Sequence, residues 1–374
     1  MNARERLKSA KRVVIKVGSS TLTYDTGRLN LNRIDHLLRE IADLKNQGKE
    51  IILVSSGAQA AGIGKLGLNK KPDTIPKKQA VAAIGQGVLM HIYEKIFAEY
   101  GQIMGQVLLT RENAVRHNQY IHSRNSLFAQ LEMGAIPVIN ENDAVAVDEI
   151  KIGDNDNLSA MVATLVDADA LIILSDIEGL YTKNPSEYKD AKLIDEIAEI
   201  TPEIEKIAGG AGSSLGTGGM ITKIQAAQIA MSAGVTMVIA SGARAGIISN
   251  VLQGEKIGTV FPARDLHLKV RKSWLAFGKS LAGEIIVDDG CANAMRSGSS
   301  ILAAGILNVD GDFAAGSTVR VLTAKQQEIA RGIVNYDSNV LTKLLGKHTA
   351  DFAKIVGTNA PHEIIHRDNM VLMV

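Results

Sequence analysis

The sequence contains a single cysteine, Cys291, which excludes an internal disulfide and a zinc site built from cysteines. Uninterrupted apolar runs are short, and none approaches the ~20 residues that a membrane-spanning helix needs. The opening residues, MNARERLKSAKR, are polar and basic, with no apolar run of the kind a signal peptide carries. Net charge is only +1, with both signs mixed along the chain, so no segment resembles an anchor for nucleic acid or membrane. We therefore expect a soluble cytoplasmic protein that does not contact a membrane.

The chain is long enough for two domains, because 374 residues exceed one ordinary hydrophobic core. Up to Phe261, short apolar strands alternate with amphipathic helices. This alternation predicts an α/β fold, with a mostly parallel sheet covered by helices on both faces. The predicted strands are 12–17, 51–54, 106–109, 136–140, 170–175 and 236–240, and the clearest helices are 32–47, 76–99 and 221–232. Asn32 is the expected N-cap of the first of these helices, and Gly48 its end.

The pattern changes after Phe261. Residues 262–280 are polar and basic and carry the only tryptophan, and short β-like runs with glycine turns follow. We expect a first domain over 1–261, a linker over 262–281, a small β-rich domain over 282–360 and a C-terminal tail over 361–374.

Glycines crowd before a lysine in LGTGGMITKIQAA, residues 215–227. This is not a Walker loop, and the nearest match to one, at Gly278-Lys279-Ser280, has Ser273 where glycine is required. A dinucleotide fingerprint is also missing after the first strand. The helix that follows the glycines would place Thr222 and Lys223 at its N-terminus, where backbone N–H groups attract anions. The segment therefore favours a phosphate contact, and a plain surface loop is the alternative.

Two polar clusters lie about a dozen residues apart, Asn140 to Asp143 and Gly153 to Asn157. Both fall at the ends of predicted elements, which suggests one shared site. The spacing from Asp154 does not fit a calcium-binding EF-hand loop. Helix capping and turns are the alternative. Lys16 interrupts the apolar strand VVIKV, and burying its charge is costly unless it is paired.

Six motifs occur in one order: KVGSS, SSGA, INENDAVAV, KIGDNDNLSA, LSDIEGLYT and GTGGMITK. With them the chain resembles the amino acid kinase family and, within it, the glutamate 5-kinase group, and the β-rich region resembles a PUA domain. The resemblance covers nearly the whole chain. It implies a three-layer αβα sandwich with a mostly parallel sheet, and an ATP-dependent phosphotransferase acting on the γ-carboxylate of L-glutamate in the first step of proline biosynthesis.

The resemblance also implies roles for particular residues. Lys16 and Lys223 match the family's phosphate-binding lysines, and Asp156, with Asp154 beside it, matches the acidic group that orients them. The positions matching glutamate binding are Ser56, Gly57, Asp143 and Asn155. The positions matching ATP binding are Lys16, Gly18, Ser175, Asp176, Thr217, Gly218, Gly219, Met220, Ile221, Thr222 and Lys223. Mg²⁺ is expected to be held mainly by ATP phosphates and water, so no protein ligand for a metal is assigned.

The same resemblance implies partners: L-glutamate as substrate, proline as feedback inhibitor and a second copy of the chain in a dimer or tetramer. It also suggests glutamyl phosphate reductase and a weak RNA contact through the PUA domain. Two alternatives remain open. One is an enzyme of this fold acting on aspartate, carbamate or a nucleotide, and the other is a protein whose main role is RNA binding. The near-balanced charge after Ser280 argues against the latter.

Overall fold

The chain divides into two compact units, Met1–His267 and Leu268–Val374, which are described separately. The computed structural model describes residues 2–24, 26, 28–68, 70–110, 117–145, 155–185, 187–209, 219–264, 281–345 and 362–373. None of the helices in these ranges is long and apolar enough to cross a membrane.

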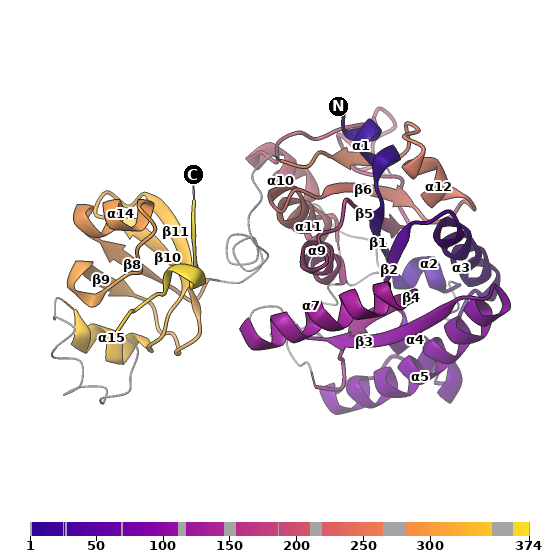
Figure 1. Ribbon diagram of the computed structural model, residues 1–374, viewed down its shortest axis with the longest axis horizontal. Coiled ribbons are helices and arrows are strands. Elements are labelled where there is room, and N and C mark those ends of the chain that lie inside the picture. Colours follow the sequence, from indigo (N-terminus) through magenta and orange to yellow (C-terminus); the bar gives the residue numbers. More distant parts are fainter. Residues whose placement is uncertain are drawn as a thin grey trace. The chain divides into compact units, whose positions relative to one another are not determined.

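A seven-stranded sheet forms the centre of the first unit, in the order β3-β4-β2-β1-β5-β6-β7 (Figure 1). Its strands are β1 (Arg12–Val17), β2 (Glu50–Ser55), β3 (Ile103–Leu109), β4 (Ala135–Glu141), β5 (Ala170–Ser175), β6 (Thr236–Ser241) and β7 (Thr259–Phe261). Every neighbouring pair is parallel except β6 and β7. The predicted mostly parallel sheet is therefore confirmed.

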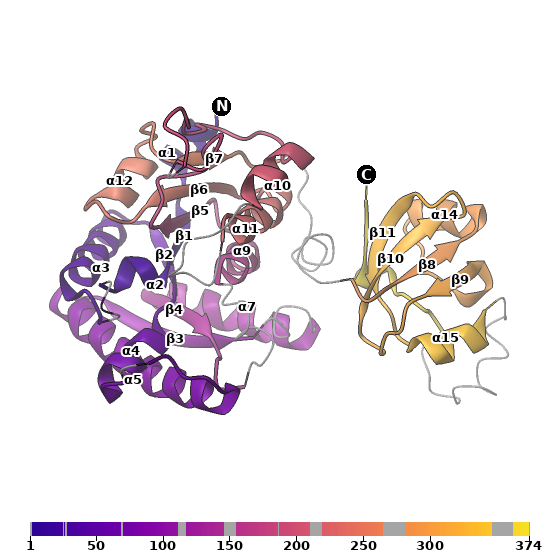
Figure 2. The ribbon, with the colours of Figure 1, turned by 180° about the vertical axis from the view of Figure 1, so that it is seen from behind.

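Helices cover both faces of this sheet (Figures 1 and 2). One face carries α7 (His117–Glu132), α9 (Asn155–Leu165) and α11 (Met220–Ser232), and the other carries α3 (Leu31–Asn46), α5 (Ile75–Glu99) and α12 (Ile247–Leu252). The described part of the unit also contains the shorter helices α1 (Ala3–Ser9), α2 (Ser19–Leu22), α4 (Ala58–Leu66) and α10 (Pro202–Ala208). The arrangement is the expected three-layer αβα sandwich.

The alternation of side chains along β1 decides which face each residue meets. Val13, Ile15 and Val17 belong to the large core that includes Leu38 of α3 and Leu89 of α5. Because successive strand residues point to opposite faces, Lys16 lies on the side of α9. The otherwise apolar strand β1 therefore places one cation, Lys16, on the face of the sheet that α9 covers.

The start of α3 differs from the sequence prediction. Its N-cap is Asn30, whose side chain accepts a hydrogen bond from the Arg33 amide at 3.1 Å. The expectation that Asn32 caps this helix is wrong, since Asn32 lies inside the first turn. At the other end, Gly48 adopts a left-handed φ of 88°, which glycine allows at little cost and which ends the helix as expected.

The second unit holds a five-stranded sheet in the order β12-β11-β10-β8-β9. Its strands are β8 (Gly283–Val287), β9 (Ile306–Asp310), β10 (Thr318–Thr323), β11 (Glu328–Ile333) and β12 (Met370–Leu372), with helices α14 (Asp289–Arg296) and α15 (Ser338–Leu344). Strand β12 lies within residues 361–374, the segment expected to be a tail, and pairs antiparallel with β11. Met370–Leu372 are therefore part of this sheet.

Candidate active site

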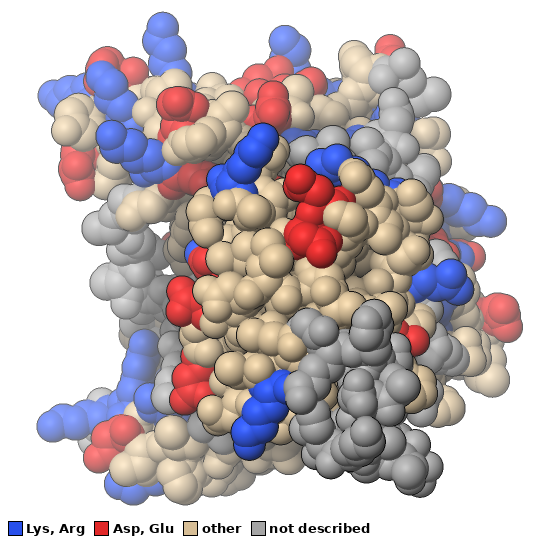
Figure 3. Space-filling model, turned by 90° about the vertical axis from the view of Figure 1, so that its left-hand side faces the viewer, with Lys and Arg blue, Asp and Glu red and all other residues tan. Residues whose placement is uncertain are grey.

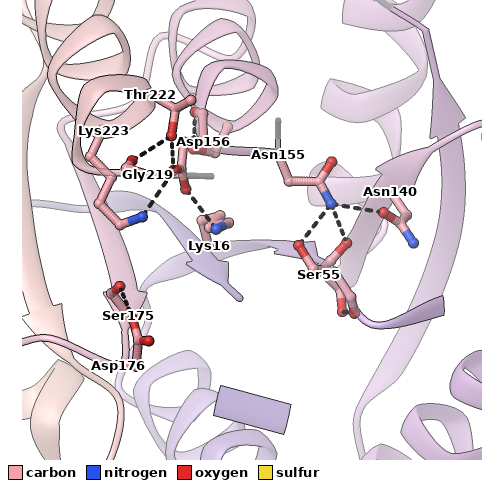
Figure 4. Close-up of polar contacts among 12 residues, drawn as sticks. Lys16, Ser55, Asn140, Asn155, Asp156, Ser175, Asp176, Gly219, Thr222 and Lys223 are labelled. Carbon is pink, nitrogen blue, oxygen red and sulfur yellow. Dashed lines mark hydrogen bonds and ion pairs between the residues drawn. The ribbon is translucent and has the colours of Figure 1, made fainter. Parts of the chain in front are cut away.

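Polar side chains gather at the carboxyl ends of the parallel strands of the first unit. Lys16 lies near the end of β1, Ser55 ends β2, Asn140 lies near the end of β4 and Ser175 ends β5. The N-termini of α9 and α11 reach the same place, as Figure 4 shows. Open α/β sheets bind ligands at this edge, because all the strand-to-helix loops meet there.

Asp156, in the first turn of α9, joins two lysines from different elements (Figure 4). Its Oδ1 lies 2.6 Å from Lys16 Nζ, and its Oδ2 lies 3.1 Å from Lys223 Nζ. Thr222 Oγ1 is a donor 2.8 Å from the same Oδ2 and also 2.8 Å from the Gly219 carbonyl oxygen. One carboxylate thus fixes the direction of two ammonium groups.

These three charges are removed from water. The exposed fractions are 1% for Asp156, 7% for Lys16 and 5% for Lys223. Burial alone would raise the pKa of Asp156, but the positive charges of Lys16 and Lys223 outweigh it and hold that pKa well below its ordinary value. Two cations face one anion, so the cluster carries an excess positive charge that can attract a phosphate.

Asn155 builds a second cluster directly beside the first. Its Nδ2 lies 3.1 Å from the Ser55 carbonyl oxygen, 2.9 Å from Ser56 Oγ and 3.1 Å from Asn140 Oδ1. Asn155 is buried, and among the described residues its Oδ1 has no hydrogen-bond partner. A buried acceptor without a partner is uncommon, so this oxygen points to a ligand that donates a hydrogen bond.

Glycines shape the backbone around both clusters. Gly57 caps the N-terminus of α4 with a left-handed φ of 96°, and a Cβ there would lie 3.3 Å from Leu22 Cδ1. A side chain at Gly18 would lie 3.6 Å from Lys16 Nζ. Gly219 caps α11, and Met220 and Ile221 begin its first turn, which leads directly to Thr222 and Lys223. Of these glycines, Gly57 is the one whose backbone conformation favours glycine.

The remaining predicted residues are less tightly grouped. Ser175 Oγ donates to Asp176 Oδ1 at 3.0 Å, with Ser175 buried and Asp176 exposed at the end of β5. Asp143 is half-buried in the turn after β4. Asp154, Thr217 and Gly218 lie outside the described residues.

Two members of the site were not assigned from the sequence. The sequence places Asn140 in a polar cluster without a role of its own, and its motifs do not include Gln86 of α5. Gln86 Oε1 accepts a hydrogen bond from Asn140 Nδ2 at 2.7 Å. The available signal was a glutamine on a helix face otherwise formed by the buried Val81, Ala82 and Leu89.

No group of three or more metal-ligating side chains is found within the part of the chain that the structure describes. Asp156 is engaged by two ammonium groups, which leaves it poorly suited to bind a cation as well. The site thus combines an excess of positive charge with a neighbouring cluster of buried amides.

Comparison with known proteins agrees with this geometry. The family profile of the amino acid kinase family matches residues 11–241, and the PUA domain profile matches residues 283–356. Glutamate 5-kinase of Moorella thermoacetica is 51% identical, over 98% of this chain and 97% of that protein. Glutamate 5-kinase of Carboxydothermus hydrogenoformans is 49% identical, over 99% of this chain and 100% of that protein.

Among solved structures, UMP kinase from Bacillus anthracis aligns with a TM-score of 0.47 at 15% identity, over 68% of this chain and 96% of that one. That likeness is too weak to add to the assignment. The match of the family profile to well over half of the chain, together with relatives of about 50% identity along its length, settles the matter: the chain belongs to the amino acid kinase family.

Proposed function

We propose that this protein transfers the γ-phosphate of ATP to the γ-carboxylate of L-glutamate, producing L-glutamyl 5-phosphate, the first step of proline biosynthesis. The observation that carries the proposal is the pair of buried lysines, Lys16 and Lys223, held by Asp156 beside the amide cluster of Asn155. Membership of a kinase family implies the use of ATP, and the full-length relatives named glutamate 5-kinase support glutamate as the acceptor.

The acceptor carboxylate needs no general base. A glutamate side chain has a pKa of about 4.3 and is already ionised at neutral pH. The obstacle is electrostatic, since one anion must approach a highly charged triphosphate. Phosphoryl transfer depends mainly on positioning and on charge stabilisation. A site with two cations and no paired acid and base fits this requirement.

Lys16 and Lys223 supply the stabilising charge in this proposal. They lie on opposite sides of the Asp156 carboxylate and come from β1 and α11, so they can contact different oxygens of the transferring phosphoryl group. The N-terminus of α11, with Gly219, adds backbone donors. Mg²⁺ would neutralise phosphate charge while held by ATP and water, because it retains much of its hydration.

The amino acid would bind beside Asn155. The Ser56 hydroxyl and the Gly57 turn follow β2, and Asp143 follows β4, so these groups converge at one edge of the sheet. The unpartnered Asn155 Oδ1 is suited to accept from an ammonium group, and Asp143 can neutralise its charge. Ser175 and Asp176 would contact the nucleotide.

A coupled assay of ADP release tests the proposal. The purified chain should release ADP in a glutamate-dependent manner and should be much less active with aspartate, carbamate or UMP as acceptor. Chemical trapping of the acyl phosphate with hydroxylamine would identify the product. Turnover of another acceptor in preference to glutamate would overturn the assignment.

The second unit gives no support to RNA binding as the main role. Figure 3 shows one face of this unit, where basic and acidic side chains are scattered and no continuous basic patch appears outside the grey atoms. Arg320 is paired with Glu284 and Arg331 with Glu328, which reduces the positive charge open to a phosphate backbone. Inhibition by proline and assembly into a homo-oligomer are further parts of the proposal, tested by adding proline to the assay and by measuring mass in solution.

A further inference from the structure

Gln86 lies on α5, a helix that carries none of the residues that the family resemblance assigns to the site. Its side chain is buried, with 9% exposed, and its Oε1 accepts from Asn140 Nδ2 at 2.7 Å. Asn140 is also buried and accepts in turn from Asn155 Nδ2 at 3.1 Å. Three amides from α5, β4 and α9 therefore form one chain of hydrogen bonds that ends at Asn155, the neighbour of Asp156.

Backbone groups fix which amide donates and which accepts in this chain of hydrogen bonds. The Glu141 amide can only donate, and it lies 2.8 Å from the Asn140 side chain, so the atom it meets must be Oδ1. The Ser55 carbonyl can only accept, so the Asn155 atom 3.1 Å from it must be Nδ2. Asn140 Nδ2 must then face Gln86, and Gln86 must present Oε1 to it. No amide in the chain can be reversed without losing one of these bonds.

The direction of this hydrogen-bond chain decides which atom of Asn155 can bind a ligand. The two hydrogens of Nδ2 face three acceptors, at Ser55, Ser56 and Asn140, so the Asn155 atom left over is Oδ1, a buried acceptor without a partner among the described residues. An acceptor suits the ammonium group of an amino acid and disfavours its carboxylates. Gln86 stands at the far end, where its Nε2 also lacks a partner within the described ranges.

Close helix packing holds Gln86 in place. A Cβ added at the preceding residue, Gly85, would lie 1.7 Å from the Ala58 carbonyl oxygen and 2.4 Å from the Gly62 amide nitrogen. Only a glycine lets α5 lie this close to α4, and Ala58 directly follows the Ser56-Gly57 turn. The same contact therefore links Gln86 to the loop that supplies Ser56.

We propose that Gln86 is a positioning residue for the amino-acid substrate: by accepting from Asn140, it orients the Asn140 and Asn155 amides so that Asn155 Oδ1 faces the ammonium group. The inference rests on the proposed function, because it takes the groups around Asn155 to be the binding site of the amino acid. Gln86 acts through Asn140 and does not itself contact the reacting atoms.

Steady-state kinetics of Gln86→Met test this role. Methionine keeps the volume of the side chain but cannot accept the Asn140 hydrogen bond. KM for glutamate should rise about fivefold or more, as expected for one lost hydrogen bond. We expect kcat, KM for ATP and the melting temperature to stay near those of the wild type, because the variant also removes an unpartnered buried donor.

Gln79→Met, at a half-buried glutamine of the same helix outside the amide chain, is the matched control and should behave as wild type.

A double-mutant cycle separates this role from a general structural one. Asn140→Ala removes the intermediate amide, so Gln86→Met should cause no further rise in KM for glutamate in that background. An unchanged KM in Gln86→Met, or an equal rise in both backgrounds, would overturn the inference while leaving the proposed function intact. Failure of the proposed function would show separately, as a wild-type chain without glutamate-dependent ADP release.

Discussion

At the scale of single residues, Lys223 has the most direct consequence for rate. Its side chain is buried and its Nζ is oriented by Asp156, so Lys223→Ala should remove charge stabilisation from the site. We expect kcat to fall about 10²-fold or more. The exposed Lys206, changed to alanine, is the control and should keep wild-type turnover. Near wild-type kcat in the Lys223 variant would remove this lysine from the mechanism.

Asp156 predicts how stability depends on pH. Its pKa is lower in the folded chain than in the unfolded chain, so its contribution to stability is present above the unfolded value of about 3.9. As pH falls below that value, the unfolded state takes up a proton that the folded state does not, and stability is lost. The melting temperature of the wild type should therefore exceed that of Asp156→Asn by an amount that shrinks as the pH falls from about 5 to about 3. A difference that stays constant over this range would contradict the assignment.

At the scale of elements, the contact between α4 and α5 is the most sensitive to added volume. The new Cβ of Gly85→Ala would collide with backbone atoms of α4, and overpacking of this kind costs about 1–3 kcal/mol. We expect a lower melting temperature and a higher KM for glutamate, because the Ser56-Gly57 turn must shift. Gly87→Ala, two residues along the same helix, meets nothing within 4 Å and is the control. There alanine should be neutral or slightly stabilising, since it favours a helix more than glycine does. Equal melting temperatures for the two variants would contradict the packing argument.

The elements that the sequence predicts well are those with a buried face. Strands β4, β5 and β6 follow from apolar runs, β1 from an apolar run that Lys16 interrupts, and α5 from a proline near its first position. Strand β3 begins at Ile103, earlier than predicted, because Gly105, a weak strand former, separates Ile103 and Met104 from the rest of the strand. Lys16, Asp156 and Lys223 could be assigned by family motifs. Gln86 could not, because its contact with Asn140 joins α5 to β4 across 54 residues of sequence and exists only in the folded chain.

At the scale of the whole molecule, every described residue of the site lies in the unit Met1–His267. This unit has its own core and its own sheet. We therefore expect a chain shortened to residues 1–267 to keep glutamate-dependent ADP release. The same assay with added proline would measure how proline affects the shortened chain. Loss of turnover in a shortened chain that still unfolds cooperatively would show that the second unit contributes to catalysis.

Asn155 and Asp156 are neighbours in the first turn of α9, one linked to the amide cluster and the other to both lysines. The groups that would hold the acceptor and the groups that would hold the donor are thus mounted on a single peptide unit. Any rigid displacement of α9 carries both together, so thermal motion of this helix changes the position of the reacting pair much more than the distance between them. Two adjacent residues of one helix would in this way hold the spacing between the two substrates constant.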